Sequence, residues 1–233
     1  MLLRSRRGMP GEGDEFTELR AYAPGDDLRR IDWAASARTG ELQSRIMLED
    51  VTLTLATIVD TSPSMLAGRV RPLAHAAHEA AREWFAAGAV RDRRVRVGAA
   101  RAHAFSLVAA LQRARRVLPR GAALLVVSDW HDLPSLDAHQ LCEFGLRFDC
   151  TALVARDPWH DGMPLVGMVR VRGAEGGARR IFIGARERSS YREASARRET
   201  TTLECLRTAR WRTALLHERD GRASLHIAFG VRA

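Results

Sequence analysis

Between residues 51 and 155 the chain alternates two patterns of apolar side chains. Short apolar runs without charged residues are typical of buried strands, whereas apolar residues that recur every three or four positions are typical of helices with one buried face. Strands are predicted at residues 52–59, 94–99, 122–127 and 150–155. Helices are predicted between them, at residues 70–84, 104–118 and 134–146.

This alternation predicts an α/β fold, with an open, doubly wound and mostly parallel sheet that carries helices on both faces. Residues 51–233 are assigned to this main domain. Residues 1–50 are polar and rich in turn-forming residues, so we expect an irregular N-terminal extension that packs on the main domain.

The pattern changes after Pro158. Two β-rich runs at residues 166–171 and 179–183 flank a glycine-rich stretch at 173–177, which predicts a hairpin. A charged helix is predicted at residues 191–211. Two further runs, 213–217 and 225–231, are predicted to close the sheet as strands.

Two aspartates follow predicted strands, Asp60 after the first and Asp129 after a later one. In sheets of this kind, ligands gather beyond the carboxyl ends of the strands, near the point where the strand order reverses. If the two strands are neighbours, these carboxylates lie at the same edge of the sheet as the hydroxyls of Ser62 and Ser64, and we call this group of side chains the rim. Such oxygen donors suit Mg²⁺ or Mn²⁺. A second interpretation stays open, because Ser62 before Pro63 is also a typical helix start.

Four stretches resemble known families. The Asp60-x-Ser62-x-Ser64 pattern after an apolar strand resembles the metal-ion-dependent adhesion site of von Willebrand factor A domains, with Asp129 in the place of that family's later aspartate. The segment "FTELRAYAPGDDLRRIDWAASARTGEL", residues 16–42, is similar to the signature of the bacterial family called domain of unknown function 58, in which it precedes a von Willebrand A-like domain. "RDP" at 156–158 and "MPLVG" at 163–167 resemble that family's later region.

The resemblance implies a von Willebrand A-like fold and a non-enzymatic protein-interaction module. In such a site Ser62 and Ser64 bind the metal directly, Asp60 and Asp129 bind it largely through water, and an open position accepts a carboxylate from a partner. The usual threonine ligand is missing, since no threonine occurs between residues 61 and 151, and Ser106 is the candidate to replace it. The family also implies a MoxR-type AAA+ ATPase as partner, with this protein as its adaptor or co-chaperone.

The N-terminal signature mixes arginines with acids. Pro24-Gly25 predicts a turn, Asp26 or Asp27 is placed to cap a short helix, and Trp33 is expected to anchor the segment to the core. Either the charges form an ion-pair network that fixes the segment, or they form a docking surface for a partner. The residues assigned to that surface are Arg20, Tyr22, Asp26, Asp27, Arg29, Asp32, Trp33 and Arg38.

Composition narrows the remaining function classes. The formal net charge is +9, but the 37 basic residues, all arginine, are interleaved with 28 acids, which disfavours nucleic-acid binding without removing it as an alternative. Without lysine there is no phosphate-binding P-loop. A metal-dependent hydrolase is the other alternative, with His131 as its candidate base. Three cysteines without a CxxC pair, no leader peptide and no membrane-spanning run together predict a cytoplasmic protein.

Overall fold

The computed structural model describes residues 10–48, 52–98, 105–162, 166–172 and 177–231. The chain divides into two compact units, residues 1–52 and 53–233, which are described separately. Some predictions fall on residues that the structure does not describe. These are the end of the predicted strand 94–99, the start of the predicted helix 104–118, the glycines at 173 and 176, and residues 163–165 of the family resemblance.

The N-terminal unit is built on a two-stranded antiparallel sheet of β1 (Pro10–Ala21) and β2 (Gln43–Leu48). Between them lie a short 3₁₀ helix (Leu28–Arg30) and α1 (Trp33–Thr39). The prediction of an irregular extension was therefore wrong. The strands escaped notice because register shifts interrupt the two-residue alternation of β1, and because half of its residues are charged or polar.

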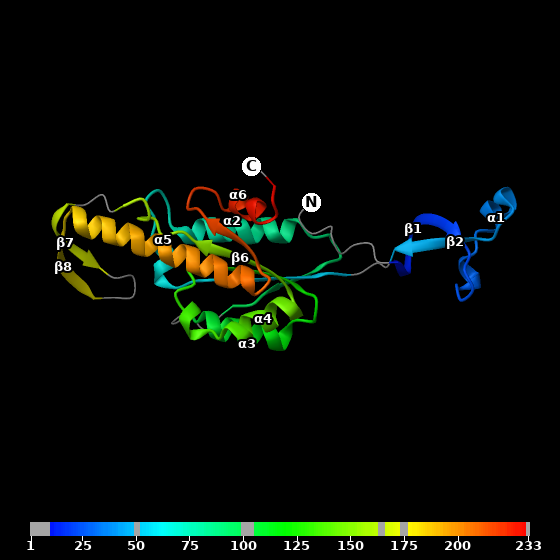
Figure 1. Ribbon diagram of the computed structural model, residues 1–233, viewed down its shortest axis with the longest axis horizontal. Helices are drawn as coiled ribbons and strands as arrows, with labels where there is room; N and C mark the ends of the chain where they lie inside the picture. The colour runs from blue at the N-terminus through cyan, green and yellow to red at the C-terminus, as the bar shows by residue number, and fades with distance from the viewer. Residues whose placement is uncertain (1–9, 49–51, 99–104, 163–165, 173–176, 232–233) are drawn as a thin grey trace. The chain divides into compact units, whose positions relative to one another are not determined.

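Residues 53–233 contain a five-stranded sheet in which every strand is parallel to its neighbours, so the predicted doubly wound α/β class is confirmed and the sheet is Rossmann-like (Figure 1). The strand order is β4-β3-β5-β6-β9. The strands are β3 (Thr54–Val59), β4 (Arg93–Arg96), β5 (Ala123–Ser128), β6 (Asp149–Ala155) and β9 (Arg212–Leu216).

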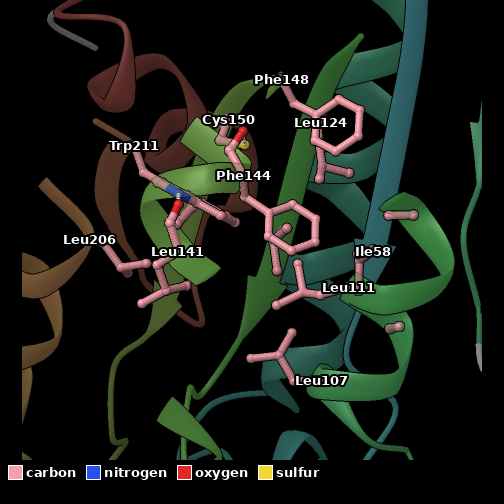
Figure 2. Packing of buried hydrophobic residues seen from close by; sticks show 14 of the residues in the cluster. Ile58, Leu107, Leu111, Leu124, Leu141, Phe144, Phe148, Cys150, Leu206 and Trp211 are labelled. Atoms are coloured by element: carbon pink, nitrogen blue, oxygen red, sulfur yellow. Dashed lines mark hydrogen bonds between the residues drawn. The ribbon is translucent and has the colours of Figure 1, made fainter. Parts of the chain in front are cut away.

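One face of this sheet is covered by α3 (Leu107–Val117), α4 (Ala138–Arg147) and the end of α5 (Ala185–Thr208). Their apolar side chains and alternate residues of β3 and β5 form one buried cluster, part of which Figure 2 shows. Trp211 belongs to this cluster: its ring packs among these side chains, and its indole N–H donates to the Leu141 carbonyl at 3.0 Å.

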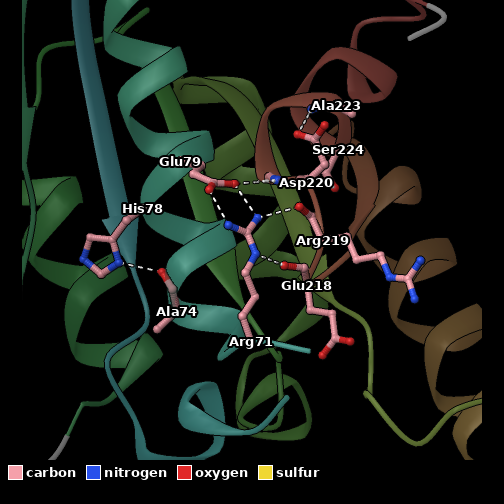
Figure 3. Close-up of polar contacts among 10 residues, drawn as sticks. Arg71, Ala74, His78, Glu79, Glu218, Arg219, Asp220, Ala223 and Ser224 are labelled. Atoms are coloured by element: carbon pink, nitrogen blue, oxygen red, sulfur yellow. Dashed lines mark hydrogen bonds and ion pairs between the residues drawn. The ribbon is translucent and has the colours of Figure 1, made fainter. Parts of the chain in front are cut away.

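The other face is covered by α2 (Leu73–Ala86) and α6 (Gly221–Ala228) (Figure 1). The two helices approach closely at Gly221, where a Cβ atom would lie 1.8 Å from the Ala76 carbonyl oxygen. Figure 3 shows a clamp at the same junction: Arg71 binds both carboxylate oxygens of Glu79 at 2.5 and 2.6 Å, and the Glu218 carbonyl at 2.5 Å. The loop after β9 is thereby tied to the start of α2.

Several predicted boundaries differ from the structure. The run 225–231 forms no strand: its first four residues are the end of α6, because Asp220 caps that helix by accepting the Ala223 N–H at 2.9 Å and so starts a helix that buries Leu225. Helix α5 begins six residues before the predicted 191, where Glu187 accepts the Gly184 N–H at 2.9 Å. Val70 precedes α2 and is exposed, since the helix starts only after Pro72.

The predicted hairpin is confirmed as β7 (Gly167–Arg172) paired antiparallel with β8 (Ala178–Ile183). It leads directly into α5. Among the described residues, no helix combines the length and the apolar character needed to cross a membrane.

Candidate functional site

The candidate site lies where the strand order reverses, between β3 and β5. From β3 the chain crosses to β4 on one side and then to β5 on the other, so the loops after β3 and β5 diverge at this point. The register places Val59 beside Val127, and the Asp60 N–H extends the ladder by donating to the Val127 carbonyl at 2.8 Å. Asp60 and the end of β5 are therefore side by side, as predicted.

Asp60 is fixed by hydrogen bonds and is only 3% exposed. Its Oδ1 accepts the Ser62 N–H at 2.7 Å, and its Oδ2 accepts the hydroxyl of Ser128 at 2.6 Å. Both carboxylate oxygens are thus engaged by donors of the protein. This arrangement positions the turn after β3 and favours an Asp60 that acts on a ligand through water rather than directly.

Three side-chain oxygens, from Ser62, Ser64 and Asp129, are linked by hydrogen bonds in the loops after β3 and β5. The hydroxyls of Ser62 and Ser64 are 2.8 Å apart, and the Ser64 hydroxyl donates to Asp129 Oδ2 at 2.5 Å. A serine hydroxyl has only one hydrogen. Because the hydrogen of Ser64 goes to Asp129, Ser62 is the donor to Ser64, and the order of donation runs from Ser62 through Ser64 to Asp129.

This donor set fits a small divalent cation. Mg²⁺ binds oxygen at about 2.1 Å in octahedral geometry, which places neighbouring ligands roughly 3.0 Å apart. The two serine oxygens already have nearly that spacing, with the Asp129 carboxylate beside them. Within the described part of the chain, no three His, Cys, Asp or Glu side chains are grouped to hold a metal, so a site here depends on the hydroxyls.

The structure joins the expected fifth ligand, Ser106, to its own helix. Ser106 is the N-cap of α3, and its Oγ accepts the Ala109 N–H at 3.3 Å. The next residue, Leu107, donates its N–H to Asp132 Oδ2 at 3.3 Å, which ties the start of α3 to the loop after β5. Among the hydrogen bonds of the described residues, none connects Ser106 to Ser62, Ser64 or Asp129.

The loop after β5 is held in a strained conformation. Trp130 has φ = 56°, in the left-handed region that a bulky residue rarely adopts. Its N–H donates to the Ser128 hydroxyl at 3.1 Å, and its buried ring meets Trp211 edge-on with the ring centroids 5.6 Å apart. These contacts hold the loop, so that Asp129 faces Ser64 and accepts the His131 N–H at 3.1 Å.

A cavity of about 300 Å³ opens beside this rim, with Ser64, Asp129 and His131 on its wall. Across the cavity the loop after β6 contributes Asp157, and α5 contributes Tyr191. The Tyr191 hydroxyl donates to Asp157 Oδ2, and Oδ1 of Asp157 accepts the Trp159 N–H at 2.8 Å. Burial, followed by the neighbouring carboxylate, raises the pKa of Tyr191, so its hydroxyl remains a donor.

Sequence reasoning missed Ser128, Asp157 and Tyr191. Ser128 could have been found from register, since extending the pairing of Val59 with Val127 by one residue places Ser128, rather than Asp129, beside Asp60. The contact between Asp157 and Tyr191 joins a loop to a helix 34 residues later. Nothing in their spacing indicates that contact.

The N-terminal signature residues form local contacts. Asp27 caps the 3₁₀ helix by accepting the Arg29 N–H at 2.9 Å. Asp26 accepts the Ala23 N–H at 2.9 Å and pairs with Arg20 at 2.6 Å. The Ala23 bond, with help from Arg20, holds the pKa of Asp26 below its ordinary value.

Asp32 caps α1 by accepting the Ala35 N–H at 2.9 Å and pairs with Arg45, a partner that the sequence did not indicate. The Ala35 bond, followed by Arg45, lowers the pKa of Asp32. Trp33 is 68% exposed within the N-terminal unit, whose buried apolar residues include Ile31 and Ala35. The expectation that Trp33 anchors this segment to the core of the main domain stays a prediction. The prediction of a partner surface that includes Tyr22, Arg29 and Arg38 stays a prediction.

Comparison with known proteins gives a partial match. Residues 18–90 match the family described as "Protein of unknown function DUF58". Uncharacterized proteins of Mycobacterium bovis (strain ATCC BAA-935 / AF2122/97) and Mycobacterium tuberculosis (strain ATCC 25618 / H37Rv) are each 47% identical to this chain over 57 residues. The match covers 24% of this chain and spans 18% of the length of each relative.

No solved structure was found to match the chain. The von Willebrand A-like assignment therefore stays a prediction. The resemblance to the domain of unknown function 58 is supported over residues 18–90, from the N-terminal unit through β3 and α2 to the turn before β4.

Proposed function

We propose that residues 53–233 form a von Willebrand A-like interaction module that binds a partner protein through a divalent cation. The observation that carries this proposal is the chain of oxygens from Ser62 through Ser64 to Asp129 at the point where the strand order reverses. Three side-chain oxygens linked by hydrogen bonds at the carboxyl edge of the sheet, two of them spaced nearly as Mg²⁺ ligands are, go beyond what a helix start requires. Ser62 itself makes no capping hydrogen bond through its side chain.

Each residue of the rim has a distinct part in this proposal. Ser62 and Ser64 would coordinate Mg²⁺ or Mn²⁺ directly, and Asp129 and Asp60 would hold water ligands. Ser128 keeps the Asp60 carboxylate in place by donating to it at 2.6 Å. A bound cation supplies an open coordination position for a carboxylate of the partner. Because the protein supplies so few ligands, several coordination positions of Mg²⁺ are left to water. Mg²⁺ usually keeps several water ligands, because it loses them only reluctantly.

The partner we propose is a MoxR-type AAA+ ATPase, with this protein as its adaptor or co-chaperone. This step rests on the resemblance to the domain of unknown function 58, whose match covers residues 18–90. An acidic side chain of the ATPase would meet the rim, where charge complementarity contributes more to specificity than to affinity. The module itself would carry out no chemical reaction.

The test is recovery of the ATPase on the immobilised protein from a lysate of cells that produce both. We expect recovery in Mg²⁺, loss in EDTA and loss for Ser64→Ala. Ser189→Ala is the matched control, because Ser189 on α5 bonds only to Glu193 at 3.1 Å among the described contacts. Equal recovery in EDTA would contradict metal dependence, and no recovery of an ATPase present in the lysate would contradict the partnership.

The same variants separate a binder from a metal-dependent hydrolase. His131 Nε2 lies 3.7 Å from Asp129 Oδ2, so a candidate base does stand at the rim. We expect no Mg²⁺-dependent turnover of p-nitrophenyl phosphate. Turnover that is lost in both Ser64→Ala and His131→Gln would replace the interaction module with a hydrolase.

A further inference from the structure

The hairpin of β7 and β8 has two chemically different faces. Opposite residues of an antiparallel pair share a face, and successive residues alternate between faces. Met168 is paired with Phe182, and Arg170 is paired with Arg180, so these four side chains lie on one face. We call this set the basic-apolar face. The opposite face is mostly apolar and has a single arginine; its residues are Val169, Val171, Arg179, Ile181 and Ile183.

The hairpin is packed against its own domain at the end that leads into α5. Ile183 is 1% exposed, and β8 contacts α5, which begins two residues later. The junction is further fixed by the bond from the Gly184 N–H to Glu187 at 2.9 Å. Figure 1 shows the hairpin beside the N-terminal half of α5. The hairpin that carries the basic-apolar face is therefore held in place at its junction with α5.

The apolar part of the basic-apolar face is exposed to solvent. Met168 is 70% exposed and Phe182 is 61% exposed. The two form a cross-strand pair, so their side chains lie side by side rather than as isolated surface residues. Such a pair contributes little to the fold in this position, because more than half of each residue stays in contact with water.

The basic part carries a repulsion that the fold does not relieve. Arg170 and Arg180 are directly opposite each other, and like charges at such positions destabilise a sheet. Both are exposed, and among the described residues neither forms an ion pair. Residues 166–192 contain seven arginines and two glutamates, a net charge of +5 out of +9 for the whole chain. An anionic surface would relieve this repulsion.

We propose that the basic-apolar face binds the surface of a membrane that contains anionic lipids. Arginines beside exposed apolar side chains suit the boundary between headgroups and acyl chains, where Arg170 and Arg180 meet phosphates while Met168 and Phe182 enter the apolar layer. The flexible Met168 beside a single aromatic ring favours a lipid over a nucleic acid, whose bases are usually stacked on several aromatic rings. The protein would bind at the surface of the membrane.

The test is co-sedimentation of the whole protein with vesicles of phosphatidylcholine alone or with 30% phosphatidylserine at low salt. We expect binding only to the anionic vesicles. Arg170→Gln with Arg180→Gln should weaken it roughly thirtyfold, the effect expected for two arginines near such a surface. Met168→Ser with Phe182→Ser should weaken it at unchanged charge. The matched control, Arg113→Gln with Arg116→Gln, removes two exposed arginines from α3 and should have a much smaller effect.

Four outcomes would overturn the proposal. These are no binding to anionic vesicles, equal binding to neutral vesicles, equal loss in the α3 control, and tighter binding to DNA or RNA that depends on the same two arginines. Circular dichroism and thermal melting of each variant ensure that a loss of binding is compared only between folded proteins. The vesicle assay uses no partner protein and no metal, so its result is independent of the proposed function.

Discussion

Removing the Ser128 hydroxyl is the sharpest test of how the rim is held. Ser128 is 1% exposed, and its hydroxyl makes two bonds, one to Asp60 Oδ2 at 2.6 Å and one from the Trp130 N–H at 3.1 Å. Ser128→Ala removes a hydrogen bond to a buried carboxylate and leaves a backbone N–H without its acceptor. Hydrogen bonds to charged groups contribute about 1.5–3 kcal/mol, and a buried unpaired donor costs about 1–3 kcal/mol.

These contributions overlap, so we expect Ser128→Ala to lower the free energy of unfolding by about 2–4 kcal/mol. The assay is urea denaturation, in which the midpoint falls while the slope stays the same. The control is Ser62→Ala, whose hydroxyl is partly exposed and can be replaced by water, with an expected loss below about 1 kcal/mol. Equal losses in the two variants would refute the conclusion that Ser128 fixes Asp60.

Three further predictions concern the packing and charges of the main domain. Gly221→Ala should lower the melting temperature, because its Cβ would collide with a carbonyl of α2, whereas Gly98→Ala, with no atom within 4 Å, should not. The bond from Arg71 lowers the pKa of Glu79 from its ordinary 4.5. The stability from this pair is therefore present above pH 4.5 and lost as pH falls through the lowered pKa. The urea midpoint of Glu79→Gln should therefore change less with pH over that range than the midpoint of the unchanged protein. Burial raises the pKa of the Cys150 thiol, so iodoacetamide at pH 8 should leave it unmodified in the native protein, as read by mass spectrometry.

Each of these predictions has a contrary result. Equal melting temperatures for the two glycine variants would mean that α2 and α6 separate without cost. An acid dependence unchanged in Glu79→Gln would mean that the clamp with Arg71 does not contribute to stability. Rapid alkylation of Cys150 without unfolding would mean that α4 opens readily from the sheet.

The sequence predicted the sheet and both aspartates at one edge because these features follow from local pattern. Apolar runs identify β3 and β5, and the carboxyl ends of parallel strands meet at the same edge, so Asp60 and Asp129 lie together provided that the two strands are neighbours. The apolar pattern left that condition open, and the structure meets it. The role of Ser128 required the register between the strands, which the pattern of apolar residues within each strand does not supply.

The failed predictions have equally specific causes. The run 225–231 is short and apolar, so its period does not separate strand from helix, and the capping Asp220 decided the outcome. In the N-terminal unit, main-chain pairing between β1 and β2 forms strands in which only about half of the residues are apolar or glycine. The contact of Tyr191 with Asp157 depends on how α5 lies against the loop after β6, which is a property of tertiary packing alone.

Binding of Mn²⁺ to the chelator-treated protein tests the central claim most directly, because free Mn²⁺ is read from its electron paramagnetic resonance signal without a partner or an activity. The account predicts one saturable site that Mg²⁺ displaces, that Asp129→Ala abolishes, and that Asp157→Asn, which alters a carboxylate across the cavity, leaves in place. Absence of saturable binding, or equal binding by Asp129→Ala, would contradict the account and leave the turn after β3 as the start of a helix.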